Sequence, residues 1–338
     1  MSLFNIEEVK RHNTEEDVWI VVNGIVYDVT QFAAIHPGGK EILLQNAGEI
    51  VTGLMKQEDI HVHSEAAYSL LETYRIGKLA NNIDDHDVEE SEMKGWKEEK
   101  IDWNQGLVLQ VHRYGFEYLK WVHSPVNKPL KLFTSRFLEF FSKTPWFLVP
   151  MVWLPVILIM TYMSFVNIGH LEYLRSTSNL AKLIFVSVLF IIGVCTWTFV
   201  EYILHRFLFH LNPPGDSKFW ITLHFFLHGQ HHKVPFDPGR LVFPPVAALA
   251  FAVPFYLLFV NILPSAIGQG IFAGGLLGYV VYDMTHYYIH HGQPTPGSYL
   301  HRLKQYHLKH HFENQNLGFG ISSTFWDGPF GTTPSKRK

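Results

Sequence analysis

Four long apolar segments, none containing Lys, Arg, Asp or Glu, restrict the fold of this 338-residue chain more than any other feature. They cover approximately residues 146–165, 183–200, 241–263 and 266–282. Each approaches the ~20 apolar residues that a helix needs to cross the hydrocarbon core of a bilayer. Buried helices in a large soluble protein are the alternative, but four such segments in one chain favour membrane spans. The sequence therefore predicts an all-α integral membrane domain with four transmembrane helices.

The distribution of positive charge orients these predicted helices. The N-terminal residues lack the apolar stretch of a signal peptide, so we expect them to stay in the cytosol. After four crossings the C-terminus returns to the same side. Within residues 105–338, this topology assigns 16 Lys and Arg residues to the cytosol and only Arg175 and Lys182 to the lumen. Because positive residues concentrate on the cytosolic side of membrane proteins, the count supports a multi-pass protein with both termini in the cytosol.

Residues 81–104 separate two regions of opposite charge. They contain nine acidic and three basic residues and few apolar ones, which predicts a solvated linker. Residues 1–80 have a net charge of −6 and residues 105–338 one of +9, and the whole chain has −3. The total gives no reason to expect a nucleic acid partner. We therefore expect one domain at 1–80, an acidic linker at 81–104 and the membrane domain at 105–338.

Two histidines of the first domain, His36 and His63, are candidate haem ligands. His36 precedes a proline and two glycines, which allow a tight turn close to a flat ligand. His63 follows 27 residues later. Two imidazoles would fill both axial positions of a haem iron and leave electron transfer as its function. The spacing alone is equally compatible with a turn histidine and an unrelated surface histidine.

Residues 4–80 resemble a cytochrome b5 domain. The resemblance rests on the hairpin at 17–28, the His-Pro-Gly-Gly turn, the His-Ser-x-x-Ala segment and the closing Tyr-Arg-Ile-Gly-Lys-Leu. It implies a small α+β haem domain in which His36 and His63 are the axial ligands of haem b. His61 is the nearest competitor, and the Ser-x-x-Ala that follows His63 favours His63.

Thirteen of the 21 histidines lie between residues 205 and 311. Because Cys195 is the only cysteine, a thiolate site is excluded, and imidazole suits iron, zinc, copper and nickel. One catalytic zinc commonly takes three protein ligands, so ten or more histidines fit two ions better than one. Eleven of the thirteen form four groups, and the predicted topology places all four groups on the cytosolic side. The groups are His205 and His210; His228, His231 and His232; His286, His290 and His291; and His307, His310 and His311.

Helical spacing places most of these histidines on common faces. Three of the groups contain histidines three or four residues apart, which share one face of a helix. His205 and His210 are five residues apart and lie off one face of an ideal helix. We therefore expect the helix to end, or to be distorted, between them.

The histidine groups resemble those of the membrane di-iron oxygenases. Four segments are similar to the sterol desaturase/fatty acid hydroxylase family: residues 201–210, 227–232, 282–287 and 306–311. The segment 118–125 and the preceding cytochrome b5-like domain resemble the fatty acid 2-hydroxylases in particular. Desaturases fused to cytochrome b5 carry a Gln-x-x-His-His motif. The corresponding motif in this chain has His307 in place of the glutamine. The resemblance implies ten metal ligands: His205, His210, His228, His231, His232, His286, His290, His307, His310 and His311.

Four further residues are candidates for contacts with the ligands: Glu201, His224, Asp283 and His291. Glu201 and Asp283 precede His205 and His286 by about one helical turn, where a carboxylate could accept the second ring N–H of a ligand. The positions of Glu201 and Asp283 are explained equally well if they are simply charged residues at a helix end near the membrane surface. No catalytic residue beyond the metal ligands is indicated.

The resemblance implies an O2-dependent monooxygenase that hydroxylates C2 of a long-chain fatty acid or ceramide acyl chain for sphingolipid synthesis. An NAD(P)H-dependent reductase would supply electrons, which pass through the haem to two iron ions in a cytosolic, histidine-rich helical cap. Zinc can replace iron in purified protein, because it ranks above ferrous iron in divalent affinity. The expected location is the endoplasmic reticulum membrane.

Two alternatives stay open. A cytochrome b5-fused fatty acid desaturase or a sterol oxidase on the same scaffold would form a product other than a 2-hydroxylated acyl chain. The second alternative is a non-catalytic membrane protein or transporter that binds haem and zinc. A transporter would need ionisable residues within the membrane spans to form an ion path.

An oxygenase of this kind needs an apolar path for the acyl chain. We expect aromatic residues around the histidine groups to line a cavity open to the bilayer, whereas ordinary packing of membrane helices explains most of them individually. The candidates are Phe207, Phe209, Phe225, Phe226, Tyr287, Tyr288 and Trp326.

Overall fold

The computed structural model describes residues 2–34, 36, 38–56, 63, 65–80 and 100–334. Residues 81–99 of the predicted linker, and His61, lie outside the described residues. The chain divides into two compact units, which are described separately. The first unit contains Met1–Leu130, Asn212–Phe236 and His311–Gln315, and the second contains Lys131–Leu211, Asp237–His310 and Asn316–Lys338.

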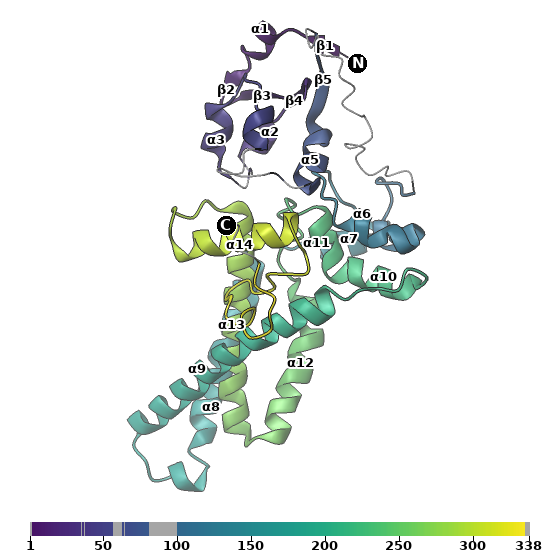
Figure 1. The fold of residues 1–338 in the computed structure, drawn as a ribbon. Helices are drawn as coiled ribbons and strands as arrows, with labels where there is room; N and C mark the ends of the chain where they lie inside the picture. Colours follow the sequence, from purple (N-terminus) through teal and green to yellow (C-terminus); the bar gives the residue numbers. More distant parts are fainter. Residues whose placement is uncertain are drawn as a thin grey trace. The chain divides into compact units, whose positions relative to one another are not determined.

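A five-stranded sheet forms the N-terminal part of the first unit (Figure 1). The strands are β1 (Ser2–Phe4), β2 (Asn13–Thr14), β3 (Asp17–Val22), β4 (Ile25–Asp28) and β5 (Arg75–Leu79), in the order β1-β5-β4-β3-β2. β1 and β5 are parallel, and the other pairs are antiparallel. Asn23 and Gly24 have φ angles of 49° and 72°, as a type I′ turn requires. The predicted hairpin is therefore confirmed.

Short helices complete this α+β domain: α1 (Ile6–Val9), α2 (Thr30–Ala33), α3 (Lys40–Gln45), α4 (Thr52–Met55), α5 (Glu65–Leu71) and the 3₁₀ helix η1 (Glu72–Tyr74). Successive side chains of a strand point to opposite faces, and β3 carries buried side chains on both faces. Val18, Ile20 and Val22 belong to one apolar core, which includes residues of α2, α4 and α5. Val21 packs with Val9 on the opposite face.

The rest of the first unit is helical: η2 (Leu107–Leu109), η3 (Val111–Glu117), α6 (Tyr118–Val122), α10 (Lys218–His224), the π-helix η6 (Phe225–Gly229) and α11 (Gln230–Lys233). The fully buried Lys233 joins two of these helices. Its Nζ donates to the carbonyls of Trp121 and Ser124 at 3.2 and 2.7 Å. The same Nζ lies 4.7 Å from the centroid of the Trp121 ring. These contacts attach α11, which carries two of the histidines, to α6.

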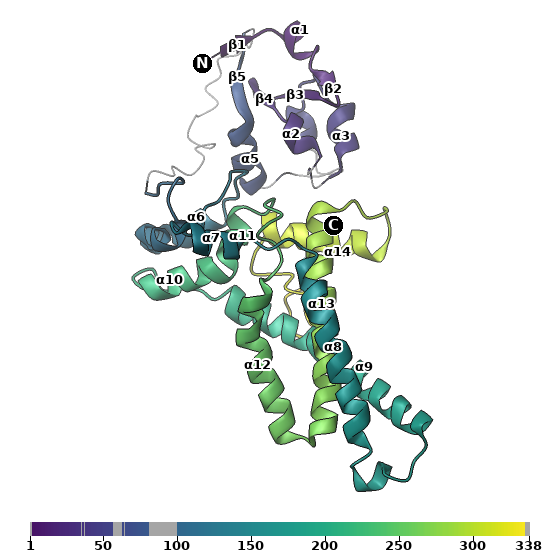
Figure 2. The same ribbon diagram turned by 180° about the vertical axis from the view of Figure 1, so that it is seen from behind.

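The second unit contains four helices long and apolar enough to cross a membrane. They are α8 (Leu148–Ile168), α9 (Asn179–Ile203), α12 (Pro245–Ile262) and α13 (Ser265–His291). α9 continues as the π-helix η5 (Leu204–Phe209). α13 contacts α8, α9 and α12 (Figure 2). A Cβ atom at Gly274 of α13 would lie 1.9 Å from the Phe190 carbonyl oxygen of α9, so glycine permits the close approach of these helices.

The four predicted apolar segments correspond to these four helices. α9 and α13 extend beyond the predicted ends and include Glu201 and Asp283, whose buried carboxylates accept from backbone N–H groups of other segments. The other helices of this part are α7 (Arg136–Ser142), η4 (Glu172–Leu174) and α14 (Tyr299–Phe312), whose last two residues belong to the first unit. The predicted fold class, an α+β domain followed by an all-α domain with four apolar helices and buried histidines, is confirmed.

Candidate metal centre

The first unit holds both candidate haem ligands next to backbone carbonyls. The Nδ1 atom of His36 lies 3.0 Å from the Gly39 oxygen, and that of His63 lies 3.3 Å from the Met55 oxygen. A proton on Nδ1 leaves the Nε2 lone pair for an axial iron. A Cβ atom at Gly38 would lie 2.9 Å from Cε1 of His36, so the turn tolerates no side chain there. These features fit a pair of haem ligands.

Three histidines of the second unit meet at the ends of α13 and α14. His286 and His290 lie one turn apart on α13, and their Nε2 atoms are 3.1 and 2.9 Å from Nε2 of His307 on α14. All three are buried. Nitrogens that share one metal ion, each at about 2.0–2.1 Å, lie at comparable separations. We call this group the His307 triad.

A second group in the same unit joins η5 to α14. His310 Nε2 lies 2.9 Å from His210 Nε2, and the His205 ring centroid lies 4.9 Å from those of both other rings. The His210 N–H donates to the His205 carbonyl at 3.0 Å, an i to i+5 bond that closes a π-helical turn. The distortion expected between these two residues is therefore confirmed. We call His205, His210 and His310 the His310 triad.

The first unit contains four more of the predicted ligands. His228, His231 and His232 lie on η6 and α11, and His232 Nε2 is 3.2 Å from His228 Nε2. His311 contacts the rings of His231 and His232 at centroid distances of 4.6 and 4.2 Å. All four are buried. η6 is a second π-helix, which the sequence did not predict.

His224 is also buried in the first unit, but its partners lie outside the predicted ligand set. Burial raises the pKa of Tyr118 well above its ordinary value, so its hydroxyl stays protonated and donates to His224 Nδ1 at 2.7 Å. Burial lowers the pKa of His224 to about 3 and that of His123 to about 4, so both rings are neutral. The His123 ring lies 5.2 Å from that of His232. His224 therefore joins α10 to the 118–125 segment.

Glu201 and Asp283 have backbone partners instead of the ligand rings suggested by the sequence. Glu201 accepts from the N–H groups of Ile321 and Ser322, both at 2.8 Å. Asp283 accepts from the N–H of Phe243 at 3.2 and 3.3 Å. His291, the last residue of α13, contacts Tyr287 at 5.0 Å. The expectation that these carboxylates hold ligand rings directly is corrected: they satisfy backbone donors of neighbouring segments.

In the His310 triad, backbone carbonyls accept the second ring N–H of the ligands, in place of carboxylates. His205 Nδ1 donates to the Phe319 oxygen at 2.5 Å, and His310 Nδ1 donates to the Leu317 oxygen at 2.8 Å. Both carbonyls belong to the chain after α14. Sequence reasoning missed them because every residue has a carbonyl, so no residue type marks the ones that are used.

An apolar cavity of the second unit lies beside the histidines, separated from them by aromatic side chains. It encloses about 890 Å³ of space between its lining atoms, part of it continuous with the outside. Residues of α9, α12 and α13 supply most of the lining, from Gly193 and Phe259 to Leu204 and Tyr282. The Tyr282 ring stacks on His286 at 5.9 Å, and Phe209, also a lining residue, lies 6.4 Å from His205.

The aromatic lining differs from the prediction. Phe209 lines the cavity as expected, but Trp326 packs on Phe199 at 4.8 Å and Phe207 is exposed. The lining comes instead from deeper aromatic residues: Trp153, Trp197, Phe243, Phe251, Phe255, Phe259, Phe272, Tyr279 and Tyr282. The prediction failed because it selected residues near the histidines in sequence, whereas the cavity lies between helices.

Comparison with known proteins agrees with this architecture. Residues 5–80 match the cytochrome b5-like heme/steroid binding domain family, and residues 190–332 match the fatty acid hydroxylase family. The chain is 41% identical to the fatty acid 2-hydroxylase of Mus musculus, over 97% of this chain and 94% of that protein. It is 37% identical to the ceramide very long chain fatty acid hydroxylase SCS7 of Saccharomyces cerevisiae, over 98% and 94%.

A solved structure shares the helical part. It is described as full-length scs7p with only the hydroxylase domain visible, and it covers 70% of this chain and 86% of its own, with a TM-score of 0.59 and 37% identity. Together with the near full-length identity to curated relatives, this likeness shows that the chain belongs to the fatty acid 2-hydroxylase family.

Proposed function

We propose that this protein is a membrane monooxygenase that uses O2 to hydroxylate C2 of a long-chain fatty acid or ceramide acyl chain for sphingolipid synthesis. One observation carries the proposal: an apolar cavity between α9, α12 and α13 is lined by Tyr282 and Phe209, whose rings contact His286 and His205 of the two histidine triads. The relatives named above, and a dihydroceramide fatty acyl 2-hydroxylase of Arabidopsis thaliana that is 44% identical over 69% of this chain, support this choice of reaction.

The ten histidines predicted from the sequence hold two iron ions in this proposal. The His307 triad and the His310 triad each offer three nitrogens within 4.8 Å of one another. His228, His231, His232 and His311 supply the remaining ligands. Bound iron supplies the activation of O2 that oxidation of a C–H bond requires. Neutral imidazoles fit such ions because burial disfavours their protonated form.

The protein's own residues orient the substrate and keep water away. Tyr282 and Phe209 border the histidines, and the cavity extends along α9 to Gly193. Eleven residues separate Gly193 from Leu204, about 16 Å of helix. An almost entirely apolar passage of this length accommodates the methylene chain of an acyl group, so the chain enters tail first and C2 stays near the histidines.

The first domain supplies electrons in this proposal. His36 and His63 would hold haem b, whose chemistry would be electron transfer between an NAD(P)H-dependent reductase and the metal site. We further propose the division into a haem domain at 1–80, a linker at 81–104 and a hydroxylase domain at 105–338. We also propose that the protein lies in the endoplasmic reticulum membrane through its four apolar helices, with both termini and the metal site on the cytosolic side.

Product analysis tests this function. The chain is expressed in a host that lacks 2-hydroxy lipids, and sphingolipids and free fatty acids are measured by mass spectrometry. We expect 2-hydroxy acyl chains from the wild-type protein and none from His286→Ala or His307→Ala. A new double bond would indicate the desaturase alternative, and an oxidised sterol the sterol oxidase. A protein that binds haem and zinc but forms no oxidised lipid would favour the non-catalytic alternative.

A further inference from the structure

Two ligands of the His310 triad are oriented by one stretch of backbone, the C-terminal segment (residues 316–334). The Phe319 carbonyl accepts from His205, and the Leu317 carbonyl accepts from His310. These histidines lie on different helices, η5 and α14. The position of the C-terminal segment therefore decides the ring orientation and the tautomer of both ligands.

Asp327 holds this segment in place. Its carboxylate is fully buried and accepts from the N–H groups of Phe319 and Gly320, both at 2.9 Å. It also accepts from the hydroxyl of Thr332 at 2.7 Å. A Cβ atom at Gly320 would lie 2.1 Å from the Ser323 oxygen, so the backbone here is tightly packed.

One peptide group connects Asp327 to the His205 ring, and Thr332 connects Asp327 to the peptide group that holds the His310 ring. The N–H of Gly320 and the carbonyl of Phe319 belong to one peptide group, which donates to Asp327 and accepts from His205. The carbonyl of Leu317 shares a peptide group with the N–H of Gly318, which donates to the Thr332 carbonyl at 2.8 Å. An anion at one end of such a chain polarises the peptide and makes its carbonyl a stronger acceptor.

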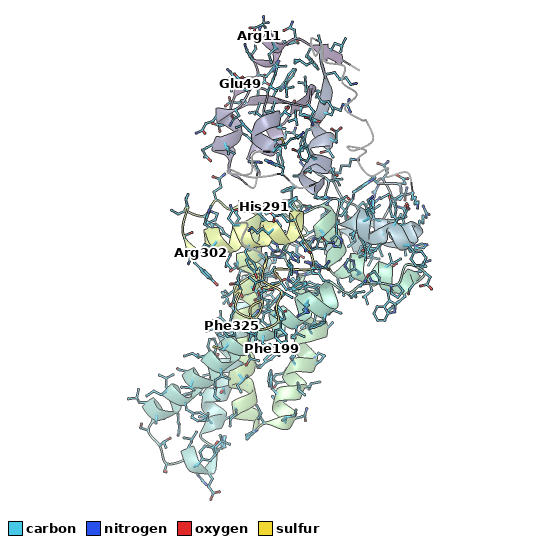
Figure 3. The ribbon with its side chains drawn as sticks, viewed as in Figure 1. Arg11, Glu49, Phe199, His291, Arg302 and Phe325 are labelled. Atoms are coloured by element: carbon cyan, nitrogen blue, oxygen red, sulfur yellow. The ribbon has the colours of Figure 1, made fainter. Side chains whose placement is uncertain are left out.

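A second carboxylate and an aromatic contact fix the same segment on α9. Glu201, four residues before His205, accepts from the backbone of Ile321 and Ser322 and from the Ser322 hydroxyl. Trp326 donates to the Thr198 hydroxyl at 3.0 Å and packs on Phe199 at 4.8 Å. Phe199 is labelled, with Phe325 of the C-terminal segment, in Figure 3.

We propose that Asp327 is a positioning residue for the metal site: it orients and polarises His205 through the peptide group of residues 319–320, and it orients His310 through Thr332 and the peptide group of residues 317–318. Both histidines are ligands of one ion only. The inference rests on the proposed binding of two ions. Histidine ligands commonly donate their second ring N–H to a carboxylate or carbonyl. Here the carboxylate acts on two ligands at once: on His205 through one peptide group, and on His310 through Thr332 and a second peptide group.

The test measures cobalt(II) binding to the full-length protein in detergent, by chelator competition and by the absorption bands of the bound ion. We expect the wild-type protein to bind two cobalt ions. Asp327→Asn keeps the shape of the side chain but loses the charge and turns an amide N–H₂ toward a backbone donor. We expect it to bind one ion as the wild type does and the other about 10- to 100-fold more weakly, with altered bands for that ion.

Glu139→Gln is the matched control. Glu139 also accepts from two backbone N–H groups, those of Leu132 and Phe133 at 2.9 and 3.0 Å. We expect this variant to bind both ions with wild-type affinity. Equal weakening of both ions in Asp327→Asn would overturn the proposal, and so would unchanged affinity and bands. A wild-type protein that binds no cobalt would instead overturn the metal site itself.

Thr332→Val keeps the proposal testable if Asp327→Asn does not fold. It removes only the hydroxyl that donates to Asp327 and contacts the Tyr202 hydroxyl at 2.8 Å. We expect a smaller loss of affinity at the same ion and full recovery in Thr332→Ser. A Thr332→Val protein with wild-type cobalt bands, or a loss that serine does not recover, would contradict the proposal.

Discussion

At the scale of single residues, the chemistry of this protein depends on which ring nitrogen of each histidine carries the proton. Four histidines, His36, His63, His205 and His310, place Nδ1 beside a backbone carbonyl. Each contact leaves Nε2 as the ligand atom. The same contact, from Nδ1 to a backbone carbonyl, therefore orients both the candidate haem ligands and part of the candidate metal site.

Substitution of His63 tests the haem assignment. We expect His63→Ala to lose the absorption spectrum of a six-coordinate, bis-histidine haem, because the iron loses one axial imidazole. His61→Ala should keep it and is the control, since His61 is the nearest alternative in the sequence. The measurement is the visible absorption spectrum of the oxidised and reduced protein. An unchanged spectrum in His63→Ala would show that another residue binds the iron.

Substitution of Lys233 tests the link between α6 and α11. Lys233→Met fills a similar volume but leaves the carbonyls of Trp121 and Ser124 without their buried donor. We expect the free energy of unfolding to fall by about 1–3 kcal/mol for the loss of such a donor. Thermal unfolding of the purified protein measures the change, with Lys131→Met, on a partly exposed lysine, as the control. Equal stability of the two variants would contradict the structural role of Lys233.

At the scale of elements, two π-helices and three glycines shape the site. η5 and η6 each add a residue to a helical turn, and η5 brings together His205 and His210, which an α-helix would separate. Gly193 and Gly274 let α9 and α13 approach closely. Gly275, one residue further along α13, lines the cavity. These are local departures from regular helices, and each one serves either the histidines or the cavity.

Gly275 provides a test of the acyl cavity. A Cβ atom there meets only the Gly193 oxygen, at 3.8 Å, so a larger side chain can enter the cavity without a backbone clash. We expect Gly275→Phe to reduce hydroxylation of long acyl chains relative to short ones by about tenfold. Competition between acyl chains of different length, read by mass spectrometry, measures this ratio. Val281→Phe, on an exposed face of α13, is the control and should leave chain-length preference as in the wild type.

At the scale of the whole molecule, the histidines tie distant parts of the chain together. The His307 triad joins α13 to α14, and the His310 triad joins η5 to α14. An ion that binds such a site binds only the folded chain, so it stabilises the fold.

Thermal unfolding tests this coupling. We expect zinc, added to metal-depleted protein at 100 times its Kd, to raise stability by about 2.7 kcal/mol for each site. His307→Ala should lose about half of the increase in Tm, because one of two sites loses a ligand. His170→Ala, an exposed histidine after α8, should behave as the wild type. An equal response of all three proteins would mean that zinc stabilises them without these histidines.

Much of the architecture followed from local sequence patterns. Apolar runs predicted the four helices, Asn23 and Gly24 predicted the hairpin, and the five-residue spacing of His205 and His210 predicted a distorted helix. Each of these is a short-range pattern whose physical cause, solvation or backbone geometry, acts within a few residues. The family followed from the same histidine and glycine motifs.

Only the tertiary structure decided which groups meet. The sequence could not show that His307 pairs with α13 and His310 with η5, because both lie on one helix three residues apart. It could not show the Leu317 and Phe319 carbonyls or the role of Asp327, because hydrogen bonds to backbone atoms leave no residue-specific pattern. The cavity was misplaced for a related reason: space between helices depends on how the side chains of α9, α12 and α13 pack together, and no single segment contains that information.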